Sequence, residues 1–259
     1  MANSDTAALI SVETAPDQWL IYPPDLADRV QACWFDREYW GAAAQPLSAD
    51  KGGRSAPLLL PTDPGPSVWR HYQRGGAVAR LLGDRYYWGG LERSRAWCEM
   101  RVTLALYERG LRVPRPLAAR VLRSGRWYRA DLLTQCLQST QTLAQRWVAS
   151  AVTDSDLQAV GAAIAALHAA GCDHADLNAH NLLFDDQKQV WALDFDRALL
   201  RPAVGVWCAA NLNRLQRSLA KVGVAPSSGQ WQSLLESYRS ALATSTRLAA
   251  NGRPDPRSS

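Results

Sequence analysis

Short apolar runs separated by glycine and proline characterise the first third of the chain. Leu58–Leu60 precedes a proline-rich breaker at 61–66, and the β-rich run Ser67–Tyr72 follows it. Such runs predict two strands of a small sheet. Residues 1–50 give few clear signals, although their aromatic residues are apolar enough to be ordered.

A helical period replaces this pattern after Gly90. Apolar residues then recur at steps of three and four until Gly110, which predicts an amphipathic helix with a glycine stop. Two strand-like runs follow, at 117–122 and 127–133, and Ser124-Gly125 between them predicts a hairpin. The stretch from Gln135 to Leu137 has no clear period and is the candidate hinge.

Helical patterns dominate the second half. One helix is predicted to begin near Thr153 or Asp154 and to end at Gly171. Strands are expected at 182–184 and 190–195 around a turn, and helices near 206–220 and 228–243. The pattern predicts an α+β protein with an N-terminal β-rich lobe at 1–135 and a C-terminal helical lobe at 136–259.

Composition narrows the class of protein. A chain of 259 residues that is 47% apolar fills a real core, so disordered and fibrous proteins are excluded. No run approaches the roughly 18 apolar residues of a membrane span, and the first residues lack the basic region of a secretory signal. Five widely spaced cysteines without C-x-x-C argue against a disulfide framework or a zinc site.

The net charge of +5 conceals an uneven distribution. Of 29 basic residues 26 are arginine, a bias for which a GC-rich genome is the simplest explanation. Yet residues 70–129 contain 14 arginines and four acids, a balance of +10, whereas residues 153–196 contain eight aspartates and one lysine, a balance of −7. This split favours either a cleft where phosphates meet metal cations or a surface that meets anionic lipid.

The most informative motif begins at His174. It has the form H-x-D-x-x-x-x-N, with Asp176 and Asn181, and a predicted hairpin then leads to Asp194 in the sequence Asp-Phe-Asp. Phosphoryl transfer needs one carboxylate to orient the attacking hydroxyl, and a carboxamide with a second carboxylate to hold Mg²⁺. Taken singly, each of the three residues is better explained as a turn cap or a strand end; their combination favours a phosphotransferase.

The motif resembles the protein-kinase-like superfamily. Within it, HADLNAHNLLFD and WALDFDRA resemble the lipopolysaccharide core kinases, above all the kinases of 3-deoxy-D-manno-octulosonic acid (Kdo). The segments WRHYQRGG, LGDRYYW, GLERSRAWCEMR, GLRVPRP and YRADLLT extend the likeness over roughly residues 50 to 200. The resemblance implies a bilobal α+β kinase fold, with a small β-rich lobe and a larger helical lobe around ATP.

By position, the resemblance makes Asp176 the catalytic base and Asn181 and Asp194 the ligands of Mg²⁺. His174 matches a loop histidine that usually supports the backbone. Glu99 takes the place of the ion-pairing glutamate of the small lobe, with a solvated helix acid as the alternative.

Arg70 occupies the place of the usual phosphate-anchoring lysine. Arginine keeps its charge and offers a fork of donors, so it suits the same phosphates with a different geometry. The alternative for Arg70 is a surface strand residue.

Three further assignments rest on placement. Gly52 and Gly53 match a degenerate phosphate loop, and Gln135 and Leu137 offer backbone groups to adenine. Asn178 and His180 lie beside the base and are candidates for contact with the acceptor.

The chain also departs from regulated protein kinases. Asn178 replaces a common lysine, Asp196 replaces the glycine after the Asp-Phe pair, and no A-P-E element follows. These departures fit a kinase that acts on a small or lipid-linked sugar.

The resemblance implies an ATP-dependent enzyme that phosphorylates the 4-hydroxyl of Kdo on a lipid A precursor. We expect it to act as a peripheral protein at the anionic cytoplasmic face of the bacterial inner membrane, without nucleic acid. The alternatives are a heptose or protein kinase of the same fold, and an inactive basic protein that binds lipid or nucleic acid.

Overall fold

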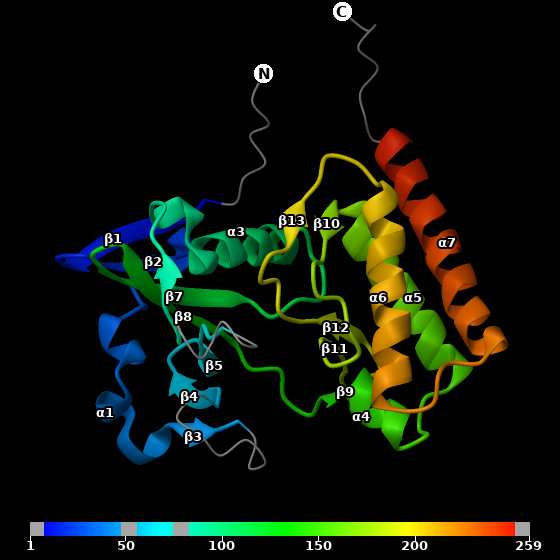
Figure 1. Ribbon diagram of the computed structural model, residues 1–259, viewed down its shortest axis with the longest axis horizontal. Coiled ribbons are helices and arrows are strands. Elements are labelled where there is room, and N and C mark those ends of the chain that lie inside the picture. Colours follow the sequence, from blue (N-terminus) through cyan, green and yellow to red (C-terminus); the bar gives the residue numbers. More distant parts are fainter. Residues whose placement is uncertain (1–7, 48–55, 75–82, 252–259) are drawn as a thin grey trace, which may run out of the picture. The chain divides into compact units, whose positions relative to one another are not determined.

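The computed structural model describes residues 8–47, 56–74 and 83–251, which belong to two compact units (Figure 1). The sheet unit comprises residues 1–108 and 114–137, and the helical unit comprises residues 109–113 and 138–259. A sheet-rich N-terminal region thus precedes a helical C-terminal region, which confirms the predicted α+β class.

An antiparallel sheet forms the body of the sheet unit. Its strands are β1 (Ile10–Ala15), β2 (Gln18–Tyr22), β3 (Gln45–Pro46), β4 (Leu58–Thr62), β5 (Gly65–His71), β6 (Tyr86–Tyr87), β7 (Pro116–Ser124) and β8 (Trp127–Gln135). They lie in the order β1-β2-β7-β8-β5-β4-β3, and β6 pairs with β8. The predicted β7–β8 hairpin is confirmed, with Gly125 at φ +60° in its turn.

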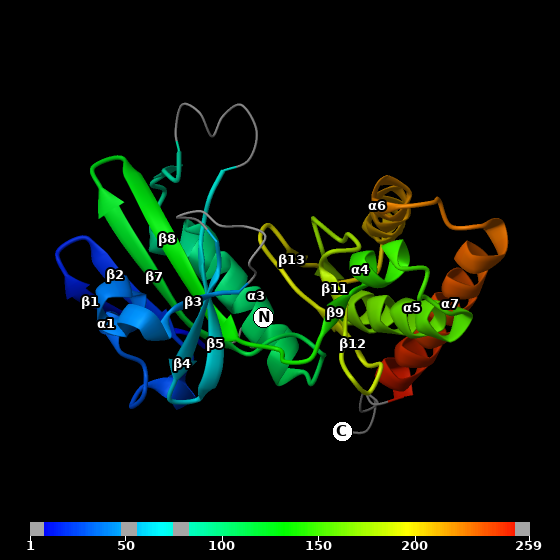
Figure 2. The ribbon, with the colours of Figure 1, turned by 90° about the horizontal axis from the view of Figure 1, so that it is seen from below.

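Both faces of this sheet are covered. The helix α3 (Arg95–Glu108) buries Ala96 and Met100 against one face, together with Ile21, Val121 and Leu132. A segment of short helices covers the other face with Trp34 and Phe35. These helices are η1 (Pro24–Leu26), η2 (Ala32–Phe35), α1 (Arg37–Trp40) and η3 (Gly41–Ala43), and η5 (Leu91–Arg93) leads into α3. Figure 2 shows α3 lying along the sheet.

Two sequence expectations need correction here. The six-residue breaker at 61–66 is a tight turn, because β4 and β5 pair up to Thr62 and Gly65. The first 50 residues contain the β1–β2 hairpin, which the sequence analysis did not predict; the four central residues of β1 are all exposed, so this strand has no buried face. Asp17, with φ 62°, makes its turn.

The helical unit contains the elements that carry the motif. Its helices are α4 (Leu143–Val148), α5 (Asp154–Ala169), α6 (Val206–Val222) and α7 (Ser228–Asn251). Its short strands are β9 (Gln141–Thr142), β10 (Cys172–Asp173), β11 (Leu182–Phe184), β12 (Val190–Ala192) and β13 (Leu199–Leu200). β11 pairs with β12 and β9, and β10 pairs with β13. Across the described ranges, no helix has the length and apolar character that crossing a bilayer requires.

The predicted start and end of α5 are both confirmed. Thr153 caps the helix and forms a reciprocal capping box with Asp156. After the helix, Gly171 adopts φ +79°, and its N–H donates to the carbonyl of His168. A side chain at Gly171 would meet the carbonyl oxygen of Arg201, so this position needs glycine for space as well as conformation.

The helices α5 and α7 lie side by side (Figures 1 and 2) and approach closely at Gly161. A β-carbon placed there would lie 2.4 Å from the carbonyl oxygen of Leu234 and 3.0 Å from the amide nitrogen of Tyr238. Both atoms are backbone, so the two helices would have to separate.

Gly161→Ala should therefore lower the free energy of unfolding by about 1–3 kcal/mol, measured by urea denaturation. In an unobstructed helix interior the same change is stabilising by roughly 0.5–1 kcal/mol. Gly229→Ala in α7 is the matched control, because a β-carbon there meets nothing within 4 Å. Equal effects of the two substitutions would contradict the close approach.

Candidate functional site

The loop between β10 and β11 is organised around the ring of His174, which is 1% exposed. Its Nδ1 accepts a hydrogen bond from the backbone N–H of Asp176 at 3.2 Å. Its Nε2 lies 3.0 Å from the carbonyl oxygen of Leu193. Since Nδ1 accepts, the proton of the neutral ring is on Nε2 and is donated to Leu193. Burial lowers the pKa of His174 below its usual 6.5, despite the opposing charges of Asp194 and Asp176.

Asp176 is exposed, and its backbone carbonyl is held from two sides. The side-chain amides of Asn178 and Asn181 both donate to that oxygen, at 3.1 Å and 3.0 Å. No described residue forms a hydrogen bond or an ion pair with the Asp176 carboxylate. The loop thus fixes the backbone of Asp176 and leaves its carboxylate open to a ligand.

The strand β12 ends at Ala192, so the predicted strand over 190–195 is too long. The N–H of Leu193 turns back to the carbonyl of Asn181 at 2.9 Å, and Asp194 takes a left-handed conformation with φ 61°. Such a conformation is uncommon outside glycine and is frequent at functional sites. Phe195, 1% exposed, packs on the ring of His174 at 5.0 Å between centroids. The metal-ligand candidates Asn181 and Asp194 are therefore tied together through their backbones.

One face of α6 supports the same loop, and sequence reasoning missed it. The buried Asn211 accepts from the N–H of His174 at 2.9 Å and donates to the Asp173 carboxylate at 3.1 Å. Arg214 donates to the carbonyl of Ala175. Ser218 accepts from the N–H of Ala179 at 3.0 Å. The three supporting residues are spaced i, i+3 and i+7, which places them on one side of a helix; this spacing was the available signal.

In the sheet unit, the structure brings Arg70 of β5 and Glu99 of α3 together. Arg70 Nη2 lies 2.5 Å from Glu99 Oε1, and the Tyr72 hydroxyl donates to Glu99 Oε2 at 2.5 Å. Glu99 is 3% exposed and Arg70 is 30% exposed. Glu99 is therefore not a solvated helix acid. The buried carboxylate orients the guanidinium, part of which remains accessible to an anion.

The remaining sequence candidates are the proposed phosphate-loop glycines, the proposed adenine contacts and the proposed acceptor contact His180. Gly52 and Gly53 lie outside the described residues. Gln135 ends β8, and its N–H already donates to the carbonyl of Arg115 at 2.8 Å, which makes that N–H unavailable to adenine. Leu137 follows the strand and is half-buried, and the exposed His180 donates its backbone N–H to Asn178 Oδ1 at 2.8 Å.

The residues of the motif suit a magnesium ion by their chemistry. Asn181 uses its Nδ2 within the loop, so its Oδ1 is left for another partner, and Asp194 supplies a carboxylate. Mg²⁺ prefers such oxygen ligands and usually takes only one or two carboxylates alongside phosphates and water. Nowhere in the described parts of the chain do three or more His, Cys, Asp or Glu side chains form a metal-binding group.

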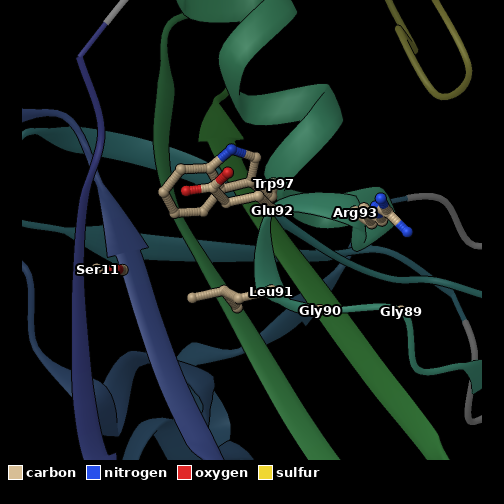
Figure 3. Close-up of a pocket in the computed structure, with 7 residues that line it drawn as sticks. All are labelled: Ser11, Gly89, Gly90, Leu91, Glu92, Arg93 and Trp97. Carbon is tan, nitrogen blue, oxygen red and sulfur yellow. The ribbon is translucent and has the colours of Figure 1, made fainter.

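A pocket of about 520 Å³ lies elsewhere in the sheet unit (Figure 3). Ser11, the Gly89–Gly90 turn, Leu91, Glu92, Arg93 and Trp97 line it. Figure 3 shows Arg93 directed away from Glu92 and Trp97. None of the sequence-predicted site residues is among the lining residues.

A buried loop histidine, an exposed loop aspartate and an Asn–Asp pair beyond it define a protein-kinase-like phosphotransferase. Comparison with known families agrees, since residues 38–238 match the lipopolysaccharide kinase (Kdo/WaaP) family. The chain belongs to this family. It is therefore a phosphotransferase that uses ATP and has a hydroxyl group as its acceptor.

Curated relatives carry a more specific name. A 3-deoxy-D-manno-octulosonic acid kinase of Stenotrophomonas maltophilia (strain R551-3) is 39% identical over 203 residues, covering 78% of this chain and 80% of the relative. Kinases of the same name from Xanthomonas oryzae pv. oryzae (strain PXO99A) and Xanthomonas campestris pv. campestris (strain B100) are 42% and 41% identical over the same shares. The resemblance to the core kinases is thereby confirmed.

Asn211→Ala should lower kcat roughly 10- to 100-fold, because a small displacement of the catalytic loop misaligns the reacting groups. KM for ATP should change far less, since the hydrogen-bond partners of Asn211 include the loop backbone and Asp173 and none of the residues proposed to contact ATP. Steady-state kinetics with ATP varied would separate the two effects.

Asn213→Ala is the matched control, because Asn213 lies on the same helix and is exposed. A melting curve of each variant shows whether the helical unit is folded under assay conditions. Equal kcat values for the two folded variants would contradict the supporting role of Asn211.

Proposed function

We propose that this chain transfers the γ-phosphoryl group of ATP to the 4-hydroxyl of Kdo on a Kdo–lipid A precursor, in the biosynthesis of the lipopolysaccharide inner core. Relatives named for this sugar support the acceptor. The observation that carries the proposal is the open carboxylate of Asp176 on a loop whose backbone is fixed on both sides.

In the proposed reaction, the Asp176 carboxylate accepts the proton of the attacking hydroxyl. The hydroxyl oxygen forms a bond to the γ-phosphorus as the bond from that phosphorus to the bridging oxygen breaks, and ADP leaves with the electron pair. Because little covalent chemistry is required of the protein, catalysis depends on positioning and charge stabilisation. The hydrogen bonds around Asp176 supply that positioning.

Arg70 is proposed to hold phosphate oxygens of ATP. Its side chain is oriented by a buried glutamate, and a guanidinium presents paired donors that match phosphate geometry. Bound Mg²⁺ would neutralise charge on the phosphate oxygens, and Asn181 and Asp194 are the residues proposed to hold it.

The proposed acceptor has acyl chains and so resides in a membrane. A chain with no membrane-spanning helix in its described part would reach such an acceptor as a peripheral protein. We place it at the cytoplasmic face of the bacterial inner membrane, where ATP is available and the lipid surface is anionic.

The test is phosphate transfer from labelled ATP, with Mg²⁺, to a Kdo-bearing lipid A precursor. Asp176→Ala should reduce kcat roughly 10²- to 10⁴-fold, the usual contribution of a positioned general base. Asp186→Ala is the matched control, because Asp186 is an exposed aspartate in the β11–β12 turn of the same unit.

Mass spectrometry of the product locates the phosphate. Label on the 4-position of Kdo is the expected result. Label on a different sugar would overturn the proposal that Kdo is the acceptor, although the protein would still be a kinase. Undiminished transfer by Asp176→Ala would overturn the proposed role of Asp176 as the base.

A further inference from the structure

Part of the positive charge in the sheet unit is engaged by residues of that unit. Arg70, Arg115, Arg120, Arg123 and Arg129 form ion pairs with Glu99, Asp25, Asp131, Asp17 and Asp84. Arg74 and Arg95 lie over the ring of Tyr86. The excess of arginine in residues 70–129 is therefore a poor guide to where an external anion binds.

Residues 197–235 carry positive charge without any acidic residue among them. This stretch contains five basic side chains and no acidic one, between Asp196 and Glu236. Arg201 pairs with Asp173, and Arg214 binds the loop backbone. Arg217 and Lys221 are exposed and form no ion pair with any residue that the structure describes.

The helix α6 presents these cations on an exposed face beside Arg214, from which Arg217 and Lys221 are spaced by three and seven residues. Leu215 and Leu219 are buried on the side that also carries Asn211 and Ser218. Val206 and Arg217 are separated by eleven residues, about three helical turns, so they share a direction on the helix. Lys221 follows Arg217 by four residues and extends the same exposed face.

Exposed aliphatic side chains occur at both ends of that face. Val206 is 92% exposed at the start of α6, and Val224 is 83% exposed just after its end. Leu199 and Val204 are also exposed in the segment that leads into the helix. Trp147 donates to the carbonyl of Val224 at 2.8 Å and fixes its position.

We propose that the α6 surface, made of Leu199, Val204, Val206, Arg217, Lys221 and Val224, is where the protein binds an anionic lipid bilayer. Unpaired cations complement the charge of anionic headgroups, and exposed aliphatic side chains at both ends let a helix lie flat in the interface. The choice of a bilayer rests on the proposed lipid-linked acceptor. Since Arg214 on the adjoining side of α6 binds the catalytic loop, membrane contact occurs next to that loop.

The test measures binding of the full chain to phosphatidylcholine vesicles with and without phosphatidylglycerol. Replacing both cations (Arg217→Gln, Lys221→Gln) should weaken binding to the anionic vesicles roughly thirtyfold, at about 1 kcal/mol per cation. The control is Arg93→Gln with Arg126→Gln in the sheet unit, which removes the same charge from exposed residues. Equal losses of vesicle binding in the two double variants would overturn the assignment of membrane binding to the α6 surface.

The apolar part is tested by Val206→Ser with Val224→Ser, which should weaken binding roughly tenfold even in high salt. Phosphorylation of a deacylated, water-soluble Kdo acceptor should be unchanged in every one of these variants. If wild type transfers phosphate but binds neutral and anionic vesicles alike, this inference fails and the proposed function stands. Self-association that both serine substitutions abolish, without vesicle binding, would also overturn it.

Discussion

The buried ring of His174 joins the two segments on which the candidate site depends. It accepts from the N–H of Asp176 and donates to the carbonyl of Leu193, the residue before Asp194. Both bonds require a neutral ring with its proton on Nε2, because an imidazolium has no acceptor. Burial favours the neutral form by lowering the pKa of His174. The position of the proposed base and of a proposed metal ligand therefore follows from one protonation state.

The helix α6 extends this arrangement. Its inner side binds the loop backbone at three places, so the loop's conformation depends on the packing of a helix 30 to 40 residues further along the chain. An adjoining exposed face carries the cations of the α6 surface, with exposed aliphatic residues at both of its ends. The same rigid element thus links the chemistry to the surface that we propose for the membrane.

Features set by local sequence were predictable, and features set by tertiary contacts were not. The helix ending at Gly110, the hairpin around Gly125 and the capped helix after Thr153 each have a periodic pattern with a start or stop residue. The end of β12 at Ala192 was missed because hydrogen bonds to His174 and Asn181 determine the turn at Leu193. Residue propensities for strand or turn do not reflect such tertiary contacts.

The same distinction applies to the site. The spacing of Asp176, Asn181 and Asp194 identified the phosphotransfer residues as candidates, since the chemistry requires those side chains. The spacing of Arg70 and Glu99 along the chain does not show that they pair; strand β5 and helix α3 bring them together. The supporting residues of α6 have no chemical signature of their own, so only the fold reveals them.

Nitrogen-15 NMR of the His174 ring tests most directly whether this imidazole organises the loop. A His174→Gln variant assigns its signals, and the buried His168, whose pKa is lowered to about 4, serves as a second neutral ring. We predict a neutral His174 with protonated Nε2 and bare Nδ1 at about pH 6.5, where an unperturbed histidine is half protonated. A proton on Nδ1, or an imidazolium at that pH, would contradict it.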